Sequence, residues 1–306
     1  MQTSLKLINK KIREWNVSEG YTETQLPFLS VYRTRNNSIL MPQHGRPYLF
    51  AVIDGFMRLH TPSGILDYNA GQYSISAIDT PSMGRVLAFS EKEDFLAVSI
   101  EFHLNDVHEV MIDLDGNLAE SILDGTVAER IMEQSDKNVM DSILSLLTAA
   151  DNEVQRDFMG RHIKREMIFH ILCGSSGKQF VQGMVQIQQS GEMYELNSWI
   201  KENYRQAFSV EELAVRWNMS VPVLHQKFKS AVGMGLLQCQ KRLRLTEARR
   251  LMLDENKNAT EAALDVGYES LSQFTREYKK MFGAAPKEDT KRLKTRFENQ
   301  ANNSEE

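Results

Sequence analysis

The spacing of apolar residues divides the chain into a part with a strand pattern and a longer part with a helical one. Between about residues 28 and 105, apolar runs are short or alternate with polar residues, as in YLFAVIDGFMRLHTP, ILDYNAGQYSISAI, RVLAFS and FLAVSIEF. Such runs are typical of strands, and the pairs Asp54-Gly55 and Ala70-Gly71 predict tight turns between them. Several short strands at regular spacing favour a small antiparallel barrel or sandwich.

From about residue 105 the apolar residues recur three and four positions apart, which is the helical period. DSILSLLTAADN and FMGRHIKREMIFHILCG show it, and GSSG at 174–177 is expected to end the second of these helices. Residues from about 190 to 296 predict helices separated by Gly, Asn and Ser caps, whereas the tail 297–306 lacks apolar spacing and is predicted to be disordered. The expected fold class is therefore α+β multidomain, with a small antiparallel β-barrel and packed helices before an all-α domain.

The C-terminal part contains a repeat at an offset of 50 residues. MSVPVLHQKFKSAVG aligns with ESLSQFTREYKKMFG, so that Ser220 corresponds to Ser270. A short helix precedes each copy: Ser209 with Glu212 predicts a capping box before the first, and Thr260 is the predicted cap before the second. Each unit therefore predicts helix, tight turn and helix, the geometry that lays one helix in a DNA groove.

The second helix of each unit has one apolar face and one polar, partly basic face. The predicted core positions are Leu224, Phe228 and Ala231 in the first unit, and Phe274, Tyr278, Met281 and Phe282 in the second. A single amphipathic helix of this kind is more often a packed bundle helix than a DNA reader. The duplication of turn, cap and basic outer face favours DNA binding.

Charge supports this interpretation, while the overall composition is ordinary for a globular protein. The chain of 306 residues is long enough for two cores, and 42% of it is hydrophobic. Residues 201–296 hold 19 Lys and Arg against 12 Asp and Glu, while the rest of the chain holds 17 against 29. A basic end on a chain of net charge −5 indicates that this end meets a polyanion.

The segment between the two copies, LLQCQKRLRLTEARRLML, predicts one long helix from Leu236 to Leu253. At 1.5 Å per residue it forms a rod of roughly 25 Å. A spacer of that length can hold two helices about one DNA turn apart, roughly 34 Å. A plain core helix is compatible with this, because one face can pack while the other sets the spacing. Lys241 adds to its basic face, and its arginines are predicted to contact phosphates: Arg242, Arg244, Arg249 and Arg250.

These motifs carry a family resemblance. The stretch from Ser209 to Arg292, with RLRLTEARRLML and VGYESLSQFTREYKKMFGAAP, closely resembles the DNA-binding domain of AraC/XylS-type transcriptional regulators. YNAGQYSISAIDTPSMGRV and REMIFHILCGSSGKQF are similar to an AraC-type N-terminal domain. The resemblance implies a cupin-like sensor or dimerisation domain with a helical linker at 1–190. It also implies a DNA-binding domain at 191–296 whose two helix-turn-helix units read successive major-groove segments.

Specific side chains are expected to contact DNA. Arg276 suits guanine O6 and N7 or a phosphate, Gln226 suits adenine, and Leu271 suits a thymine methyl group. Ser220 and Ser270 lie at helix starts that attract anions, although capping alone is the favoured role for them. The predicted DNA-contacting residues are Ser220, Pro222, Val223, His225, Gln226 and Lys229 in the first unit, and Ser270, Leu271, Ser272, Gln273, Thr275, Arg276, Lys279 and Lys280 in the second.

An enzyme is the main alternative, because cupin-like barrels can hold metals. Such a site needs clustered His and Glu, and only His103 and His108, beside Glu101 and Glu109, form even a thin constellation. HxH, HExxH, G-x-S-x-G and P-loop motifs do not occur. We therefore predict no catalytic residues, no metal and no cofactor. A module whose two units bind another protein is a second alternative, against which the basic outer faces argue.

The remaining expectations concern location and partners. No apolar run approaches a membrane span and the N-terminus shows no export signal, and the isolated Cys173 and Cys239 suit a reducing interior, so the chain is predicted to be cytoplasmic. The expected partner is double-stranded DNA, with no membrane. Further candidate partners are RNA polymerase, a small-molecule effector of the N-terminal domain, and a second copy of the chain. The helices within 138–172 either form that dimer interface or pack under the barrel.

Overall fold

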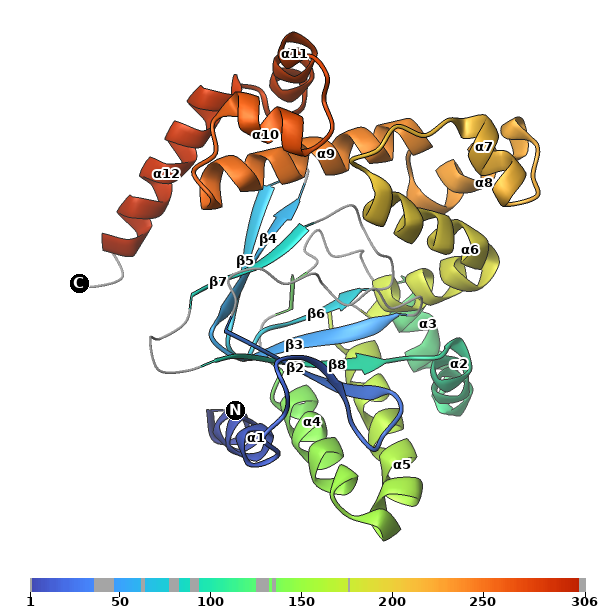
Figure 1. The fold of residues 1–306 in the computed structure, drawn as a ribbon. Helices are drawn as coiled ribbons and strands as arrows, with labels where there is room; N and C mark the ends of the chain where they lie inside the picture. The colour runs from blue at the N-terminus through green and yellow to red at the C-terminus, as the bar shows by residue number, and fades with distance from the viewer. Residues whose placement is uncertain are drawn as a thin grey trace. The chain divides into compact units, whose positions relative to one another are not determined.

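The structure, a computed structural model, describes residues 2–35, 47–61, 64–76, 83–88, 94–124, 132–133, 136–175 and 177–302. They form two compact units. The first holds most of the chain up to Gly191, and the second holds Glu192 onwards together with Leu59–Leu66. In the colouring of Figure 1 the helices of the second unit run from yellow to red.

The main sheet of the first unit is antiparallel and has the strand order β1-β2-β8-β3-β6-β9. Its strands are β1 (Gly20–Glu23), β2 (Leu29–Thr34), β3 (Tyr48–Asp54), β6 (Tyr73–Ser76), β8 (Phe95–Glu101) and β9 (Met132–Glu133). The central strands β3 and β8 are near-continuous apolar runs, and they are buried along almost their whole length. In their register Val98 lies opposite Ala51 on one side and opposite Val31 on the other.

A second sheet has the order β5-β4-β7 and consists of β4 (Phe56–Thr61), β5 (Gly64–Asn69) and β7 (Met83–Ala88). The turn into β4 lies at Asp54-Gly55, where Gly55 has a φ of 79° and donates its N–H to the Asp54 carboxylate at 2.9 Å. The turn between β5 and β6 lies at Ala70-Gly71, where Gly71 has a φ of 89°. Both predicted turns are confirmed, as is an N-terminal antiparallel β-structure with helices.

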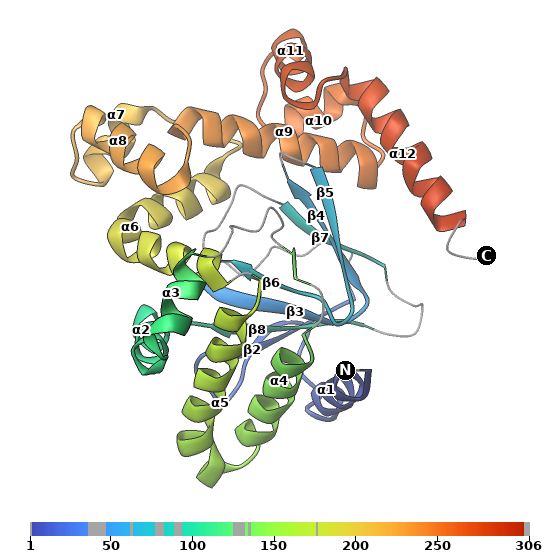
Figure 2. The ribbon, with the colours of Figure 1, turned by 180° about the vertical axis from the view of Figure 1, so that it is seen from behind.

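Five helices lie wholly within the first unit among the described residues. They are α1 (Gln2–Glu14), α2 (Leu104–Asp113), α3 (Gly116–Asp124), α4 (Lys137–Ala150) and α5 (Glu153–Cys173). α4 and α5 lie side by side, α1 packs on α4, and α2 packs on α5 (Figures 1 and 2). α5 ends directly before Gly174, as predicted. α1 was not predicted, although its buried residues Ile8 and Ile12 lie one helical turn apart.

The second unit is built from helices around one apolar core. It contains the C-terminal part of α6 (Gly177–Asn203), a helix that crosses the predicted domain boundary at 190–191, and the following whole helices: α7 (Val210–Arg216), α8 (Val221–Val232), α9 (Leu236–Asp254), α10 (Ala259–Asp265), α11 (Leu271–Phe282) and α12 (Pro286–Asn302). α12 continues through residues 297–302, so the prediction of disorder is wrong for that part. Its backbone extends the last amphipathic helix although the apolar spacing has ended. Residues 303–306 of the predicted tail lie outside the described residues.

Candidate nucleic-acid interface

The second unit contains the same helix–turn–helix element twice, formed by α7 with α8 and by α10 with α11 (Figure 1). α7 begins with the predicted capping box: Ser209 Oγ accepts from the Glu212 N–H at 3.0 Å, and Glu212 accepts from the Ser209 N–H at 3.3 Å. α10 begins with the same arrangement, but its residues are Asn258 and Glu261. The predicted cap Thr260 is therefore wrong. Asn ranks above Thr at this position, and Thr260 donates its N–H to the Asn258 side chain instead.

Each turn between the paired helices contains a residue in the left-handed region. This residue is Asn218 in the first unit, with a φ of 52°, and Gly267 in the second, with a φ of 87°. Asn adopts this conformation more readily than most residues, and Gly does so freely. In both turns an N–H beyond the turn donates to a carbonyl of the first helix: Met219 to Ala214 at 2.8 Å, and Tyr268 to Ala263 at 2.9 Å. The two units thus reach one backbone geometry with different residues.

The second helix of each unit also ends in the same way. α8 stops at Gly233 and α11 at Gly283, both in the left-handed conformation, and each donates its N–H to the fourth residue before it at 2.9 Å. The predicted inner faces are confirmed in part. Leu224, Phe228, Ala231, Phe274 and Tyr278 are buried, and Met281 and Phe282 are half-buried against the same core.

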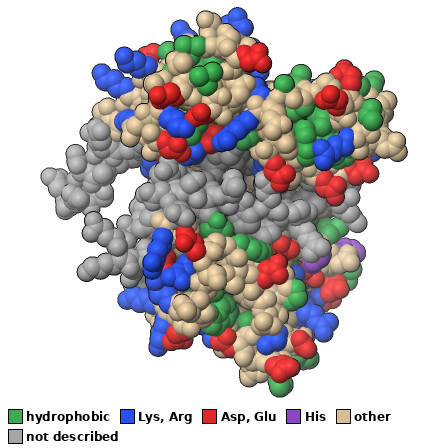
Figure 3. Space-filling view, viewed as in Figure 1, with side chains coloured by type: hydrophobic (Ala, Val, Ile, Leu, Met, Phe, Trp, Pro, Cys, Tyr) green, Lys and Arg blue, Asp and Glu red, His purple; other side chains and the backbone are tan. Residues whose placement is uncertain are grey.

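The opposite faces of α8 and α11 are open to solvent. Thr275 is half-buried. The other predicted DNA-contacting residues are exposed: Ser220, Pro222, Val223, His225, Gln226, Lys229, Ser270, Leu271, Ser272, Gln273, Arg276, Lys279 and Lys280. Two of them are large apolar side chains, Val223 at 40% exposure and Leu271 at 44%. Figure 3 shows Lys and Arg side chains over the part of the surface formed by α11 and α12. The folded chain therefore presents the residues of each predicted reading surface together.

Some predicted contacts have partners within the chain. Ser270 Oγ caps α11 by accepting from the Gln273 N–H at 3.3 Å, whereas Ser220 caps α8 without a side-chain hydrogen bond to the described backbone of that helix. Gln273 Nε2 donates to Glu277 Oε1 in a long hydrogen bond of 3.4 Å. Pro222 lies in the first turn of α8, where its missing N–H leaves no helical bond unmade.

The structure corrects the predicted role of three arginines on the connecting helix α9. Arg249 and Arg250 are each only 7% exposed. Arg249 forms two hydrogen bonds to Asp289, at 2.8 and 3.0 Å, and Arg250 pairs with Glu247 at 2.6 Å. Arg244, half-buried, is bound to backbone carbonyls. These three guanidinium groups are satisfied inside the protein, because α9 is wrapped by helices on most of its sides, and phosphate contact is wrong for them.

Arg244 joins the two helix–turn–helix units. Its Nε donates to the Tyr204 carbonyl at 2.6 Å, just before the first unit, and its Nη1 donates to the Gly267 carbonyl at 2.8 Å, in the turn of the second. Its Nη2 reaches the carbonyls of Arg205 and Gln206, both at 3.1 Å. Burial lowers the pKa of the Arg244 guanidinium, which nevertheless remains a cation. Sequence reasoning missed this role, which depends on segments that are distant in the chain.

The backbone at Gly267 approaches its neighbours so closely that no room is left for a side chain. A Cβ atom on Gly267 would lie 2.0 Å from the Arg205 carbonyl oxygen and 3.2 Å from Arg244 Nη2. The backbone of the second turn therefore rests directly on the segment that precedes the first unit. Together with Arg244, this contact fixes the two helix–turn–helix units relative to each other.

A second hydrogen-bond network holds α11 on its buried side. Tyr278 donates its hydroxyl to Asp289 Oδ2 at 2.9 Å, and Asp289 is fully buried on α12 between Tyr278 and Arg249. Burial, and then the adjacent carboxylate, raise the pKa of the Tyr278 phenol well above its usual value. The phenol therefore stays a donor, and the network ties α9, α11 and α12 together.

Glu277 anchors the side of α11. It accepts from the Tyr268 hydroxyl at 2.8 Å and pairs with Lys241 of α9 at 3.1 Å. Burial by itself raises the pKa of Glu277, but the hydrogen bonds from Tyr268, Lys241 and Gln273 outweigh it and hold that pKa below its usual range. Lys241, which belongs to the predicted basic face of α9, is half-exposed and engaged in this pair.

Across the described ranges, no three His, Cys, Asp or Glu side chains gather closely enough to hold a metal ion. Over the same ranges, no helix combines the length and the apolar character that crossing a membrane requires.

Comparison with known proteins identifies two family models. The model described as AraC-type transcriptional regulator N-terminus matches residues 25–179, about half of the chain. The model described as helix-turn-helix domain matches residues 213–292, which include α8 and α11.

Curated relatives match the C-terminal part. The HTH-type transcriptional activator RhaS of Yersinia pestis bv. Antiqua (strain Angola) is 30% identical over 110 residues, which cover 36% of this chain and 40% of RhaS. RhaS of Yersinia pseudotuberculosis serotype O:1b (strain IP 31758) is 30% identical over 100 residues, or 33% of this chain and 37% of RhaS. The match thus spans about two fifths of the length of these relatives.

Solved structures with a similar chain trace include two proteins. ToxT from Vibrio cholerae strain SCE256, bound to an unsaturated fatty acid, has 13% identity and a TM-score of 0.44, over 86% of this chain and 94% of that one. The DNA-binding domain of AdpA in complex with a target DNA has 26% identity and a TM-score of 0.33, over 34% of this chain and 94% of that one.

Proposed function

The chain belongs to the AraC family of transcriptional regulators, and we propose that it binds double-stranded DNA by placing α8 and α11 in two successive major-groove segments. Residues 191–296 form the DNA-binding domain in this proposal, and residues 1–190 form a cupin-like sensor or dimerisation domain. Family membership also argues against an enzyme. Binding to chromosomal DNA assigns the activity to the cytoplasm.

The observation that carries the proposal is the duplicated unit with two open faces. Both reading helices are buried on one side in a shared apolar core and exposed on the other. α9 has 19 residues, so its axis is about 28 Å long. Such a rod supports a spacing of roughly one DNA turn between the two helices.

The proposed contacts follow from side-chain chemistry. Arg276 forms paired hydrogen bonds to guanine or grips a phosphate, and Gln226 pairs with adenine N6 and N7. The exposed apolar side chains Val223 and Leu271 suit thymine methyl groups, since an apolar side chain in solvent gains by covering a methyl group. The remaining positions bind phosphates or support the others, with Lys229, Lys279 and Lys280 as the phosphate contacts.

The N-terminal compact unit has an exposed apolar surface that we propose pairs with a second copy of the chain. On α5, Val154 is 85% exposed and Phe158 is 66% exposed, and Met159 lies beside them. Large apolar side chains are costly in water, and a dimer that pairs the α4–α5 hairpins would cover them. A small-molecule effector of this unit and RNA polymerase are the further partners that we propose, since RhaS is a transcriptional activator.

Selection from random DNA duplexes with the full chain tests the proposal. We expect an enriched sequence with two conserved segments, and an affinity that falls steeply as salt increases, because Lys and Arg displace counterions from phosphates. Gln226→Ala should relax base preference in one segment and Arg276→Ala in the other. Glu153→Ala, an exposed position at the start of α5 in the first unit, is the matched control. Failure to enrich any sequence, or binding that is insensitive to salt, would refute the proposal and favour a protein-interaction module.

A further inference from the structure

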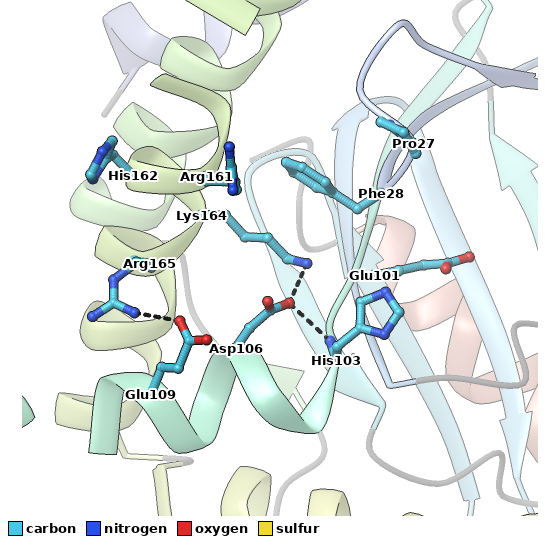
Figure 4. Close-up of a pocket in the computed structure, with 10 residues that line it drawn as sticks. All are labelled: Pro27, Phe28, Glu101, His103, Asp106, Glu109, Arg161, His162, Lys164 and Arg165. Carbon is cyan, nitrogen blue, oxygen red and sulfur yellow. Dashed lines mark hydrogen bonds and ion pairs between the residues drawn. The ribbon is translucent and has the colours of Figure 1, made fainter. Parts of the chain in front are cut away.

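The N-terminal compact unit contains a cavity of about 630 Å³ that is remote in sequence from α8 and α11. It lies between α5, the start of α2, the end of β8 and the segment before β2 (Figure 4). A volume of this size suits a small organic molecule. Its lining includes His103, Glu101 and Glu109, three of the four residues named above as a thin metal constellation, but not His108.

Close packing at Gly160 creates one wall of the cavity. A Cβ atom on Gly160 would lie 2.7 Å from Leu26 Cδ2, so the missing side chain lets the segment with Pro27 and Phe28 rest against α5. One helical turn later, Lys164 Nζ lies 4.5 Å from the centre of the Phe28 ring. Pro27 and Phe28 therefore form an apolar wall opposite the basic face of α5 (Figure 4).

The acidic groups of α2 that line the cavity already have partners. Asp106 Oδ2 accepts from Lys164 Nζ at 2.5 Å and from the His103 N–H at 3.1 Å. Glu109 Oε2 accepts from Arg165 Nη1 at 2.9 Å. Lys164 itself is only 5% exposed, so its charge is held inside the wall and not at the protein surface. Both acidic side chains that α2 contributes to the lining are thus paired, as are Lys164 and Arg165, two of the three Lys and Arg side chains from α5.

The third cation, Arg161, has no carboxylate within ion-pair distance in the part of the chain that the structure describes. Its recorded hydrogen bond runs from Nε to the Asp157 carbonyl, at 3.4 Å, within the same helix. The terminal N–H groups of its guanidinium are directed at the cavity lining beside Lys164 and across from Phe28 (Figure 4). A guanidinium in this state is a fork that binds a carboxylate or a phosphate through two hydrogen bonds.

We propose that this cavity binds a small organic anion whose charged group lies against Arg161 and whose apolar part lies against Pro27 and Phe28. The buried Lys164 adds positive potential behind that position. The cavity would then be the effector site of the regulator. The regulatory role of this site rests on the proposed function, whereas the binding of the anion does not.

Titration of the full chain with matched probes tests the proposal. The probes are 3-phenylpropionate, its neutral analogue 3-phenylpropionamide, and phenyl phosphate, each followed by calorimetry and ligand-observed NMR. We expect at least one anion to bind about 10-fold tighter than the amide, since one charge-assisted contact separates them. Tighter binding of the carboxylate or of the phosphate would identify the charged group, and either result supports the site.

Variants assign the binding to the cavity. Arg161→Gln keeps a polar side chain at an exposed position and should weaken the preferred anion about 10-fold. Lys137→Gln, which removes an exposed cation on α4, is the matched control and should bind like the wild type. Equal affinity for acid and amide, an unchanged affinity in Arg161→Gln, or no anion binding up to about 10 mM would each overturn the proposal.

DNA binding by the same preparations separates this proposal from the previous one. A wild-type chain that binds its selected DNA but neither anion retains the proposed function and loses the effector site. A chain that binds an anion through Arg161 but enriches no DNA retains the binding site and loses the regulator function. A DNA affinity that the bound anion changes, and that it leaves unchanged in Arg161→Gln, supports both.

Discussion

Arg244→Met is the substitution that best isolates the bridge between the two reading units. Methionine keeps an unbranched apolar stem but removes every donor from the bridge. The wild-type guanidinium makes two short hydrogen bonds, to the carbonyls of Tyr204 and Gly267, and two longer ones at 3.1 Å. Counting the two short bonds alone, at about 1.5 kcal/mol for each charge-assisted bond, gives a loss of about 3 kcal/mol.

We take the low end of the range for each bond because Arg244 is half-buried. In Arg244→Met, water can therefore hydrogen-bond to some of the freed carbonyls and offset part of the lost stability. Hydrogen exchange of the full chain is the suitable assay, since it reports each segment separately while a two-unit chain need not unfold in one step. Peptides covering 204–206 and 264–268 should both exchange faster in Arg244→Met. Arg244→Lys should recover less than half of the loss, because an ammonium group cannot span the four carbonyls.

Arg242→Met is the matched control on the same helix, where the guanidinium approaches Met234 Sδ at 4.0 Å. It removes the same charge without touching the bridge, so exchange at 204–206 and 264–268 should stay at the wild-type rate. The reasoning is refuted if Arg244→Met leaves both segments as protected as in Arg242→Met. Faster exchange in one segment alone would show that Arg244 serves one unit and does not join the two.

Three further predictions concern α11. Arg276→Ala should weaken binding to the selected DNA by about 1–3 kcal/mol and relax preference at one base pair, and an anisotropy titration with unchanged affinity and preference would exclude the contact. Tyr278→Phe removes the donor to the buried Asp289 and should lower the free energy of local opening around α11 by about 1–2 kcal/mol, so unchanged hydrogen exchange of the α11 amides would contradict the network. Glu277 has a lowered pKa, so its stabilisation is fully present above the usual pKa of 4.5 and is lost as the pH falls through the lower folded value. The stability difference from Glu277→Gln should therefore shrink below pH 4.5, and a constant difference from pH 7 to about pH 3 would speak against it.

The helix–turn–helix pair was predictable because its signals are local. A capping box, a glycine after the helix and apolar residues at helical spacing all lie within a few positions of one another, and each is read directly from the sequence. Ser209 with Glu212 forms the predicted capping box, and the glycines at 233 and 283 end α8 and α11 in line with the Gly caps expected between these helices. The cap at Asn258 was missed since two suitable residues stand two positions apart.

The roles of the basic residues were not predictable in the same way. Arg249 meets Asp289, which is 40 positions away, and Arg244 meets carbonyls on two sides of α9. From sequence alone, an arginine on a helix between two predicted DNA-binding units is as compatible with phosphate contact as with an internal ion pair. Glu247, three residues before Arg250, was the one local signal of an internal pair. The cavity had no local signal, because Phe28, Asp106 and Arg161 come from separate elements.

The central claim is that one rigid unit carries two reading helices that grip a duplex at successive turns. Hydroxyl-radical footprinting of the full chain on its selected DNA tests it most directly, because cleavage reports both the spacing and the face of the contacts. The account predicts two protected windows on one face of the duplex, about 10–10.5 base pairs apart from centre to centre. A single window, or two windows on opposite faces, would contradict it.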